Sequence, residues 1–290
     1  MKSRLAVWLF LVPALLAPGC HKASPEPPVA TPVVTLSQNR FPLGSPLQLT
    51  YEFRVAQGAP RFMEDYRVFV HFVDNDDEVM WTDDHYPPTP TTQWKPGQTI
   101  KYSRLMFVPV YPYVGEASVE IGLYGKDGSR LPLAAVDKGK RAYRVARIEV
   151  APQTESIYLT YKDGWHAAEM APDNATNEWH WTKQEASLSF KNPKRNAIFY
   201  LDYGPQPKIM TEPQTVTVSL GGTVLDTFRI GRSPDLRRIP ITVDQLGPND
   251  QVELKLSVDR TFVPSVIAAG SQADKRDLGL CVYHAYVEAQ

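Results

Sequence analysis

Cysteine is nearly absent from this chain, with Cys20 and Cys281 the only two among 290 residues. A framework of several disulfides and a cysteine-rich zinc site are therefore both excluded. The histidines show no zinc-binding spacing such as His-Glu-x-x-His. The sequence also lacks a Gly-x-Ser-x-Gly elbow, a phosphate-binding glycine loop and a dinucleotide fingerprint. We expect no metal ion, no cofactor and none of the enzyme classes that these motifs mark.

An excess of one sign of charge is also absent, since 31 Lys and Arg residues stand against 32 Asp and Glu residues. No basic stripe indicates a nucleic-acid interface. Long apolar runs are missing too, because the one extended run, residues 5–16, is too short to span a bilayer. The sequence therefore predicts neither a nucleic-acid partner nor a transmembrane helix.

The first 20 residues have the composition of an export signal. Lys2 and Arg4 precede the apolar run, and small residues follow it. The ending Leu15-Leu16-Ala17-Pro18-Gly19-Cys20 resembles a bacterial lipobox, in which the cysteine is acylated and becomes the first residue of the mature protein. An ordinary secretory signal with a cysteine near its cleavage site is the alternative.

The lipobox resemblance implies a signal peptide over residues 1–19 and a lipid anchor on Cys20. Several acyl chains make such anchoring effectively permanent. His21 rather than aspartate follows the cysteine, which in proteins similar to Gram-negative lipoproteins implies delivery to the outer membrane. Residues 20–34 are rich in proline and small residues, so we expect a solvated, stiff tether. The expected location is the bacterial cell envelope, with the membrane as a partner.

The composition favours short strands joined by turns, with 26 prolines, 14 tyrosines, 11 phenylalanines and 6 tryptophans. No long segment shows the period of a helix. The chain exceeds the usual size of one domain, so two are expected. The prediction is an all-β protein of two tandem β-sandwiches, the first immunoglobulin-like over residues 35–152 and the second over residues 153–290.

Strand signals recur at regular intervals in the first domain. Residues 47–55 alternate apolar and polar side chains, and residues 68–73 are almost continuously apolar, which predicts a central strand. Further strands are predicted at 78–82, 100–108, 117–124 and 143–150. The acidic residues at 74–78 are interpreted as a solvated turn, because Val79 stands where a calcium-binding EF-hand loop needs glycine. This spacing of strands suits an immunoglobulin-like sandwich.

Six short motifs follow one another in this domain: Phe69-Val70-His71-Phe72, Trp81-x-Asp83-Asp84-His85, Trp94-x-Pro96-Gly97-Gln98, Val108-Pro109, Gly122-Leu123-Tyr124 and Arg130-Leu131-Pro132-Leu133. Their order resembles the extracytoplasmic sandwich modules of bacterial envelope proteins, including those attached to membrane glycosyltransferases. The resemblance implies a fold and a compartment. It implies no transferase activity, because the sequence contains no membrane-embedded catalytic part.

The second domain opens on an irregular aromatic stretch and continues with strands predicted at 186–190, 197–203, 214–220, 223–230, 252–258 and 278–287. Gly221-Gly222 predicts a two-residue hairpin turn with positive φ. The order Trp165-x-x-x-Glu169, Trp179-x-Trp181-Thr182 and Asp274-x-Arg276-x-Leu278-Gly279 resembles a module of bacterial glycosyltransferases and surface-polysaccharide proteins. That resemblance implies a jelly-roll or related sandwich of the carbohydrate-binding type.

Trp165, Trp179 and Trp181 are the first candidate ligand-binding residues. A flat aromatic face can stack on the C–H surface of a sugar ring. The same side chains could instead fill the end of the core, and Trp179 and Trp181 share one face of the strand if it is extended. The sequence leaves both interpretations open.

Glu169, Asp274 and Arg276 complete the candidate ligand site. A glycosidase needs two carboxyl groups at a defined separation, which the sequence does not fix. We favour an Arg–carboxylate fork that ties the loop before the last strand to the start of the domain. No catalytic residue is assigned.

Trp94, Tyr111 and Tyr113 could form a secondary aromatic patch on the first domain for a partner or a glycan. Packing at turns and sheet edges is the alternative. Cys281 lies in an apolar strand and is predicted to be an inert buried thiol.

Three functions are compatible with these observations. We favour a non-catalytic envelope lipoprotein that binds a glycan or a component of polysaccharide assembly. The second is a structural lipoprotein that binds another envelope protein, and the third, supported only by available carboxylates, is a polysaccharide hydrolase.

Overall fold

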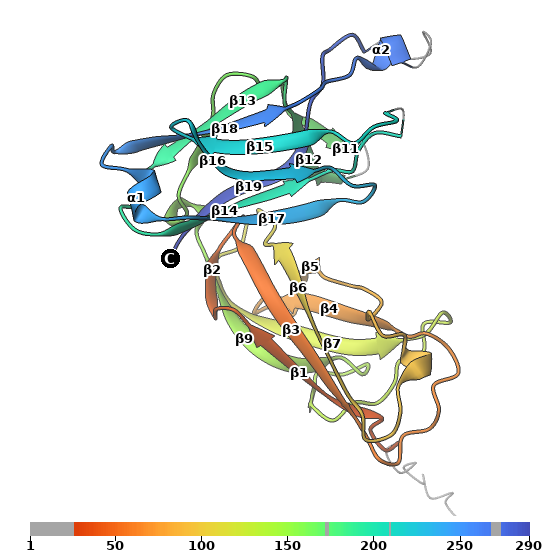
Figure 1. The fold of residues 1–290 in the computed structure, drawn as a ribbon. Coiled ribbons are helices and arrows are strands. Elements are labelled where there is room, and N and C mark those ends of the chain that lie inside the picture. The colour runs from red at the N-terminus through yellow and green to blue at the C-terminus, as the bar shows by residue number, and fades with distance from the viewer. Residues whose placement is uncertain (1–25, 172–173, 209, 268–273) are drawn as a thin grey trace, which may run out of the picture.

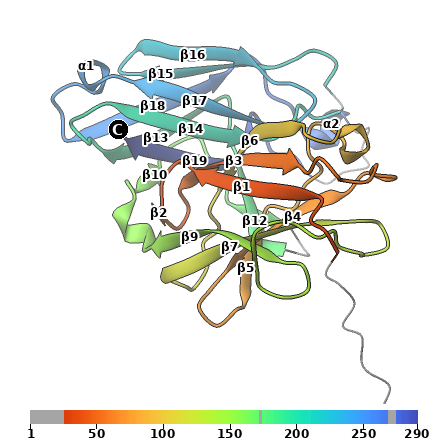
Figure 2. The same cartoon turned by 90° about the horizontal axis from the view of Figure 1, so that it is seen from below.

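The computed structural model describes residues 26–171, 174–208, 210–267 and 274–290. These residues form two β-sandwiches, one above the other in Figure 1 and overlapping in Figure 2, which confirms the predicted all-β class. The predicted signal peptide and the anchor at Cys20 lie outside the described residues. No helix in the described part has the length and hydrophobicity to cross a membrane.

The first sandwich packs a three-stranded sheet against a larger one. The small sheet has the order β1 (Ala30–Leu36), β3 (Pro46–Val55), β6 (Thr99–Phe107). The large sheet has the order β2 (Arg40–Pro42), β9 (Tyr143–Ala151), β7 (Gly115–Tyr124), β4 (Arg67–Val73), β5 (Val79–Thr82), with β8 (Val136–Asp137) beside β9. The strands equivalent to A, B and E therefore face those equivalent to C, F and G, as in an immunoglobulin-like sandwich.

The prediction that residues 20–34 form a solvated tether is wrong from Ala30 onward. β1 begins at Ala30 and pairs antiparallel with β3, from Ala30 opposite Val55 to Leu36 opposite Leu49. Ala30, Pro32 and Val34 point inward and are buried, so this proline-rich stretch contributes to the core. Pro32 is tolerated because β1 is an edge strand and one side of its backbone needs no partner.

Alternating side chains build the core of the first sandwich as predicted. Leu47, Leu49, Tyr51, Phe53 and Val55 of β3 are all buried, while the intervening residues are partly or fully exposed. They pack with Val68, Val70 and Phe72 of β4 in one hydrophobic cluster. β4 lies between β7 and β5, which confirms the predicted central strand.

The second sandwich contains two five-stranded sheets. One has the order β10 (Leu159–Tyr161), β13 (Glu185–Lys191), β18 (Gln251–Val258), β15 (Thr215–Leu220), β16 (Thr223–Arg229). The other has the order β11 (Glu169–Ala171), β12 (Asn174–Trp181), β19 (Cys281–Ala289), β14 (Ala197–Tyr203), β17 (Asp235–Ile241). Most successive strands lie in opposite sheets, as in a jelly roll.

Short elements complete the chain: the 3-10 turns η1 (Thr91–Gln93) and η2 (Gln153–Glu155) and the helices α1 (Val243–Leu246) and α2 (Pro264–Ile267). Gly221 and Gly222 join β15 to β16 with φ of 54° and 86°, which confirms the predicted hairpin turn. η2 carries the chain from the first sandwich into the second.

Candidate functional site

A groove of about 500 Å³ lies where the two sandwiches meet. One wall comes from the first sandwich, where residues 43–44 follow β2 and residues 108–110 follow β6. The other wall comes from β10, β12 and β19 of the second sandwich, and the link around η2 joins the two. The lining includes four tyrosines: Tyr158, Tyr161, Tyr283 and Tyr286.

The tyrosine ring at position 161 is held by two aromatic neighbours. It stacks on His180 of β12, with ring centroids 4.5 Å apart and 21° between the planes. Trp165 meets the same ring edge-on at 4.7 Å, and its indole N–H donates to the carbonyl of Ser187 at 2.7 Å. Trp165 therefore holds the Tyr161 ring in place but does not itself line the groove.

Gly164 allows Trp165 to take this position. Its φ is +83°, and a Cβ at this residue would lie 1.9 Å from the carbonyl oxygen of Glu185. A larger residue would be strained in backbone conformation and would collide with β13. The close approach of backbone segments thus sets the place of Trp165.

Exposed apolar side chains form part of the groove lining. Tyr158 is 79% exposed, Val110 is 61% exposed and Tyr161 is 37% exposed, and all three line it. On the far side, the Tyr286 hydroxyl donates to Ser156 Oγ at 3.1 Å, which fixes that ring against the link. Exposed aromatic surface of this kind commonly marks an interaction site.

Three of the groove phenols, Tyr161, Tyr283 and Tyr286, are kept neutral at physiological pH by burial. Burial raises the pKa of Tyr161 to about 12, and the nearby Glu178 carboxylate adds to this effect. Burial likewise raises the pKa of Tyr283 and of Tyr286. Each of these three hydroxyls can therefore both donate and accept a hydrogen bond.

Strand alternation separates the three tryptophans of the predicted site. Trp179 and Trp181 share one face of β12, as expected, but Glu178 and His180 occupy the opposite face with Tyr161 and the groove. Trp181 packs edge-on against Phe262 at 5.5 Å, in a small cluster with Met210 and Leu278. The three indoles do not form one platform.

The predicted fork of Arg276 is present. Its guanidinium donates to both oxygens of Asp274, at 2.7–3.2 Å, and Nη2 lies 2.7 Å from Oε1 of Glu169. These hydrogen bonds from Arg276 lower the pKa of Asp274 to about 2. None of the three residues lines the groove. The geometry agrees with a structural tie between the loop before β19 and β11.

The predicted secondary patch is wrong. Trp94 is 3% exposed, packs with Phe53 and Phe62, and donates its indole N–H to the carbonyl of Thr89 at 2.9 Å. Tyr111 and Tyr113 are half-buried and pack against the core of the first sandwich. Large rings at the end of a sandwich gain more from covering the core than from facing water.

Cys281 is buried, and burial raises the pKa of its thiol to about 12. At neutral pH the thiol is therefore protonated and a poor nucleophile.

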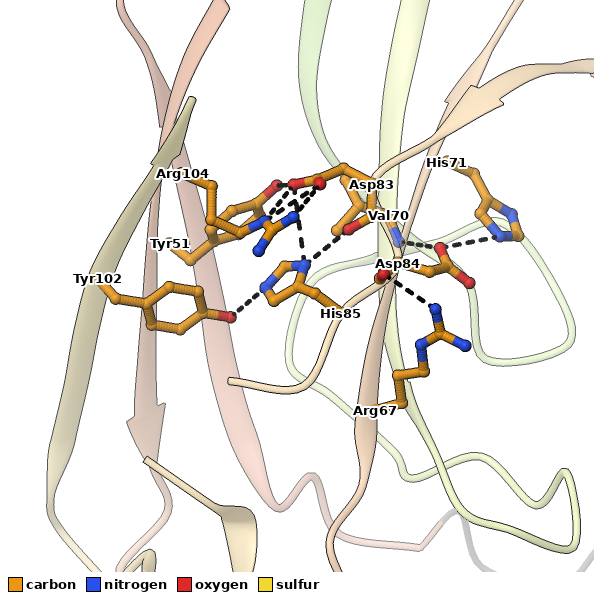
Figure 3. Close-up of polar contacts among 9 residues, drawn as sticks. All are labelled: Tyr51, Arg67, Val70, His71, Asp83, Asp84, His85, Tyr102 and Arg104. Atoms are coloured by element: carbon orange, nitrogen blue, oxygen red, sulfur yellow. Dashed lines mark hydrogen bonds and ion pairs between the residues drawn. The ribbon is translucent and has the colours of Figure 1, made fainter. Parts of the chain in front are cut away.

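A buried polar network links the two sheets of the first sandwich (Figure 3). Asp83 follows β5 and accepts hydrogen bonds from the Tyr51 hydroxyl at 2.9 Å and from the Arg104 guanidinium at 2.7–3.1 Å. His85 Nδ1 donates to the Asp83 carbonyl at 2.6 Å, and the Tyr102 hydroxyl donates to His85 Nε2 at 2.8 Å. Tyr51, Tyr102 and Arg104 belong to the small sheet, so the network clamps the sandwich together.

Asp84 makes a second set of contacts beside this network (Figure 3). Its carboxylate accepts from the backbone N–H of Val70 at 3.0 Å and lies 3.7 Å from His71 Nε2. Its carbonyl accepts from Arg67 at 3.1 Å. The motif Asp83-Asp84-His85 is thus used for sheet attachment, and none of its residues lines the junction groove.

Metal binding has no candidate in the part of the chain that the structure describes, because no three His, Cys, Asp or Glu side chains converge there. The acidic turn after β4 is a hairpin, in which Asp74 Oδ1 accepts from the backbone N–H groups of Asp76 and Glu78 at 2.9 Å.

No protein-family model matches the sequence, and no curated protein matches it. Solved structures are similar over part of the chain, and three of them illustrate the extent of the likeness. A family GH115 4-O-methyl-α-glucuronidase, BtGH115A, is 13% identical with a TM-score of 0.32, over 47% of this chain and 18% of that one. The CBM51-2 and INT domains of Clostridium perfringens ZmpB, in complex with GlcNAc, are 12% identical with a TM-score of 0.24, over 62% and 39%.

The CBM22-1–CBM22-2 tandem domain of Paenibacillus barcinonensis Xyn10C is 10% identical with a TM-score of 0.26, over 86% of this chain and 79% of that one. This chain therefore spans less than half the length of the first two structures.

Sequence reasoning missed the groove residues Tyr158, Tyr161, Glu178, Tyr283 and Tyr286. The high tyrosine count was visible, but the groove joins segments separated by more than a hundred residues. Of the predicted ligand residues, Trp165 alone contacts a groove side chain through its own ring.

Proposed function

We propose that the protein binds a glycan in the junction groove and does not act on it. The observation that carries the proposal is the group of four tyrosines around one open groove, two of which present 79% and 37% of their surface to solvent. Aromatic rings stack on the C–H faces of sugars, and neutral phenol hydroxyls hydrogen-bond to sugar hydroxyls. The volume falls within the usual range of ligand sites.

The charged groups of the groove support binding without hydrolysis. A glycosidase of the common type places two carboxyl groups on either side of the scissile bond. Among the described residues that line the groove, Glu178 is the only Asp or Glu. The ion-paired carboxylates Glu169 and Asp274 are not part of the lining.

The proposal includes attachment to the bacterial envelope through acylated Cys20, and delivery to the outer membrane. The composition of residues 1–20 and the lipobox-like ending support it. Growth with a labelled fatty acid tests the anchor: label should enter the wild-type protein and be lost in Cys20→Ser. Equal labelling of both proteins would refute it.

A glycan array with the soluble form that starts at Ala23 tests the binding. Tyr158→Ala should weaken binding about tenfold, because it removes one stacking surface. The side chain is mostly exposed, so the variant should fold normally, as checked by circular dichroism and thermal unfolding. Tyr86→Ala is the matched control, since Tyr86 is 58% exposed but does not line the groove.

Two results would contradict this function. If Tyr158→Ala bound the glycan as tightly as the wild type, the binding site would lie outside the junction groove. Failure to bind any glycan would favour a scaffold that binds another envelope protein.

A further inference from the structure

Glu178 gives the junction groove an unbalanced negative charge. No lysine or arginine lines the groove in the described part of the chain. The Glu178 side chain is 50% exposed and lies on the same face of β12 as His180. It is therefore within reach of a bound ligand as well as of solvent.

The neighbours of Glu178 do not neutralise it. His180 Nε2 lies 3.9 Å from Glu178 Oε1, but burial lowers the pKa of His180, so the imidazole is neutral at pH 7. Tyr161 is a neutral phenol at the same pH. On the wall formed by β19, the His284 imidazole Nδ1 lies 2.8 Å from the Asp202 carboxylate, so this imidazole is paired with Asp202 and not with Glu178.

A carboxylate beside several tyrosine rings is suited to an ammonium group. The ring faces attract a cation, and the carboxylate accepts its charge-assisted hydrogen bonds. A uronate or a phosphate would be repelled by Glu178, with no lysine or arginine among the described lining residues to offset the repulsion. An N-acetylated sugar would leave the carboxylate without a cationic partner.

We infer that the groove selects a glycan that carries free amino groups, and that the Glu178 carboxylate binds the ammonium group. This inference rests on the proposed glycan-binding function and specifies its substrate class. An ammonium group could also come from a lysine-rich peptide or from choline. The ring stacking that Tyr158 and Tyr161 offer favours the amino sugar, because it uses the sugar ring as well as the charge.

Calorimetry with the protein purified in its natural form tests the inference. The probes are glucosamine oligomers, their fully N-acetylated counterparts, oligogalacturonate, trilysine and choline, at about pH 6, where a free amine is protonated. Glucosamine oligomers should bind best and oligogalacturonate should not bind. Glu178→Gln should weaken the glucosamine oligomers about three- to fivefold, as for a partly exposed ion pair, and leave the N-acetylated oligomers unchanged.

Glu155→Gln is the matched control, because Glu155 lies in the same link region but pairs with Arg40 and does not line the groove. Added salt should weaken wild-type binding of glucosamine oligomers more than that of Glu178→Gln.

The outcomes separate the two proposals. Equal affinity for aminated and N-acetylated oligomers, or no effect of Glu178→Gln, would overturn amine selection and leave glycan binding intact. Trilysine or choline that binds as tightly as the oligomers would also overturn it. No binding of any glycan would overturn both proposals.

Discussion

Phe107 of the first sandwich and His284 of the second stack face to face across the junction, with ring centroids 4.5 Å apart and 13° between the planes. A second contact joins the sandwiches where Arg238 donates to the Gln48 side chain at 3.3 Å. The junction also holds a smaller cavity of about 220 Å³ beside Gln48 and Arg238. Both sandwiches therefore line the groove, and the stacking of Phe107 on His284 helps to hold the two sandwiches in place relative to each other.

We predict that Phe107→Ala weakens ligand binding in the groove several-fold and leaves each sandwich folded. The stacked pair contributes about 1 kcal/mol, and its loss lets the two walls move apart. Small-angle scattering should show a broader distribution of shapes, while calorimetry reports the affinity. Phe107→Tyr keeps the ring and should behave like the wild type. Unchanged affinity in Phe107→Ala would show that the junction is held by other contacts.

Asp83 should be the most sensitive polar residue of the first sandwich. Asp83→Ala removes the shared acceptor of the buried Tyr51 hydroxyl and the Arg104 guanidinium, so we expect the free energy of unfolding to fall by about 3 kcal/mol. Tyr51→Phe removes one hydrogen bond and should cost about 1 kcal/mol. Denaturant unfolding monitored by tryptophan fluorescence measures both.

An exposed ion pair provides the control for Asp83. Glu155→Gln breaks the pair with Arg40 at the surface, and the free energy of unfolding should be close to unchanged. If Asp83→Ala proved as mild as Glu155→Gln, the network would not clamp the two sheets.

Acidification should destabilise the protein in two steps. Burial is the main cause that lowers the pKa of His71, His85 and His180 in the folded state. Well above about pH 6.5 these histidines are neutral in both the folded and the unfolded protein. At lower pH the unfolded chain binds protons more readily than the folded protein, so the free energy of unfolding decreases as the pH is lowered. The lowered pKa of Asp274, about 2, acts the same way below about pH 4, where the unfolded carboxyl protonates first.

Urea unfolding at about pH 7.5 and about pH 5.5 measures the histidine step. His85 faces Asp83, Tyr51, Tyr102 and Arg104, all within a closed network, and so it cannot relax easily to accept a proton. His180→Phe keeps the stacked ring on Tyr161 but cannot titrate, and it should reduce the slope of stability against pH. Stability that is constant or rises on acidification would contradict the prediction.

The strands were largely predictable because a half-buried sheet imposes a period of two on the sequence. β3 and β18 show this alternation clearly, and the run of apolar residues in β4 marks a strand between two neighbours. The start of β1 was missed because prolines outweighed the alternation of Ala30, Pro32 and Val34. The prediction of the secondary patch was wrong because the sequence does not show whether Trp94 covers the core or faces water.

The sequence by itself determined the all-β class, most strand positions, the hairpin at Gly221-Gly222 and the presence of an ion pair around Arg276. These depend on local periodicity, turn chemistry and complementary charge. Only the tertiary structure decided which aromatic rings are exposed, and it brought Tyr158, Tyr161 and Glu178 together with residues 283–286 at the junction. The physical reason is that side-chain exposure and the meeting of distant segments depend on how whole sheets pack, and no short stretch of sequence contains that information.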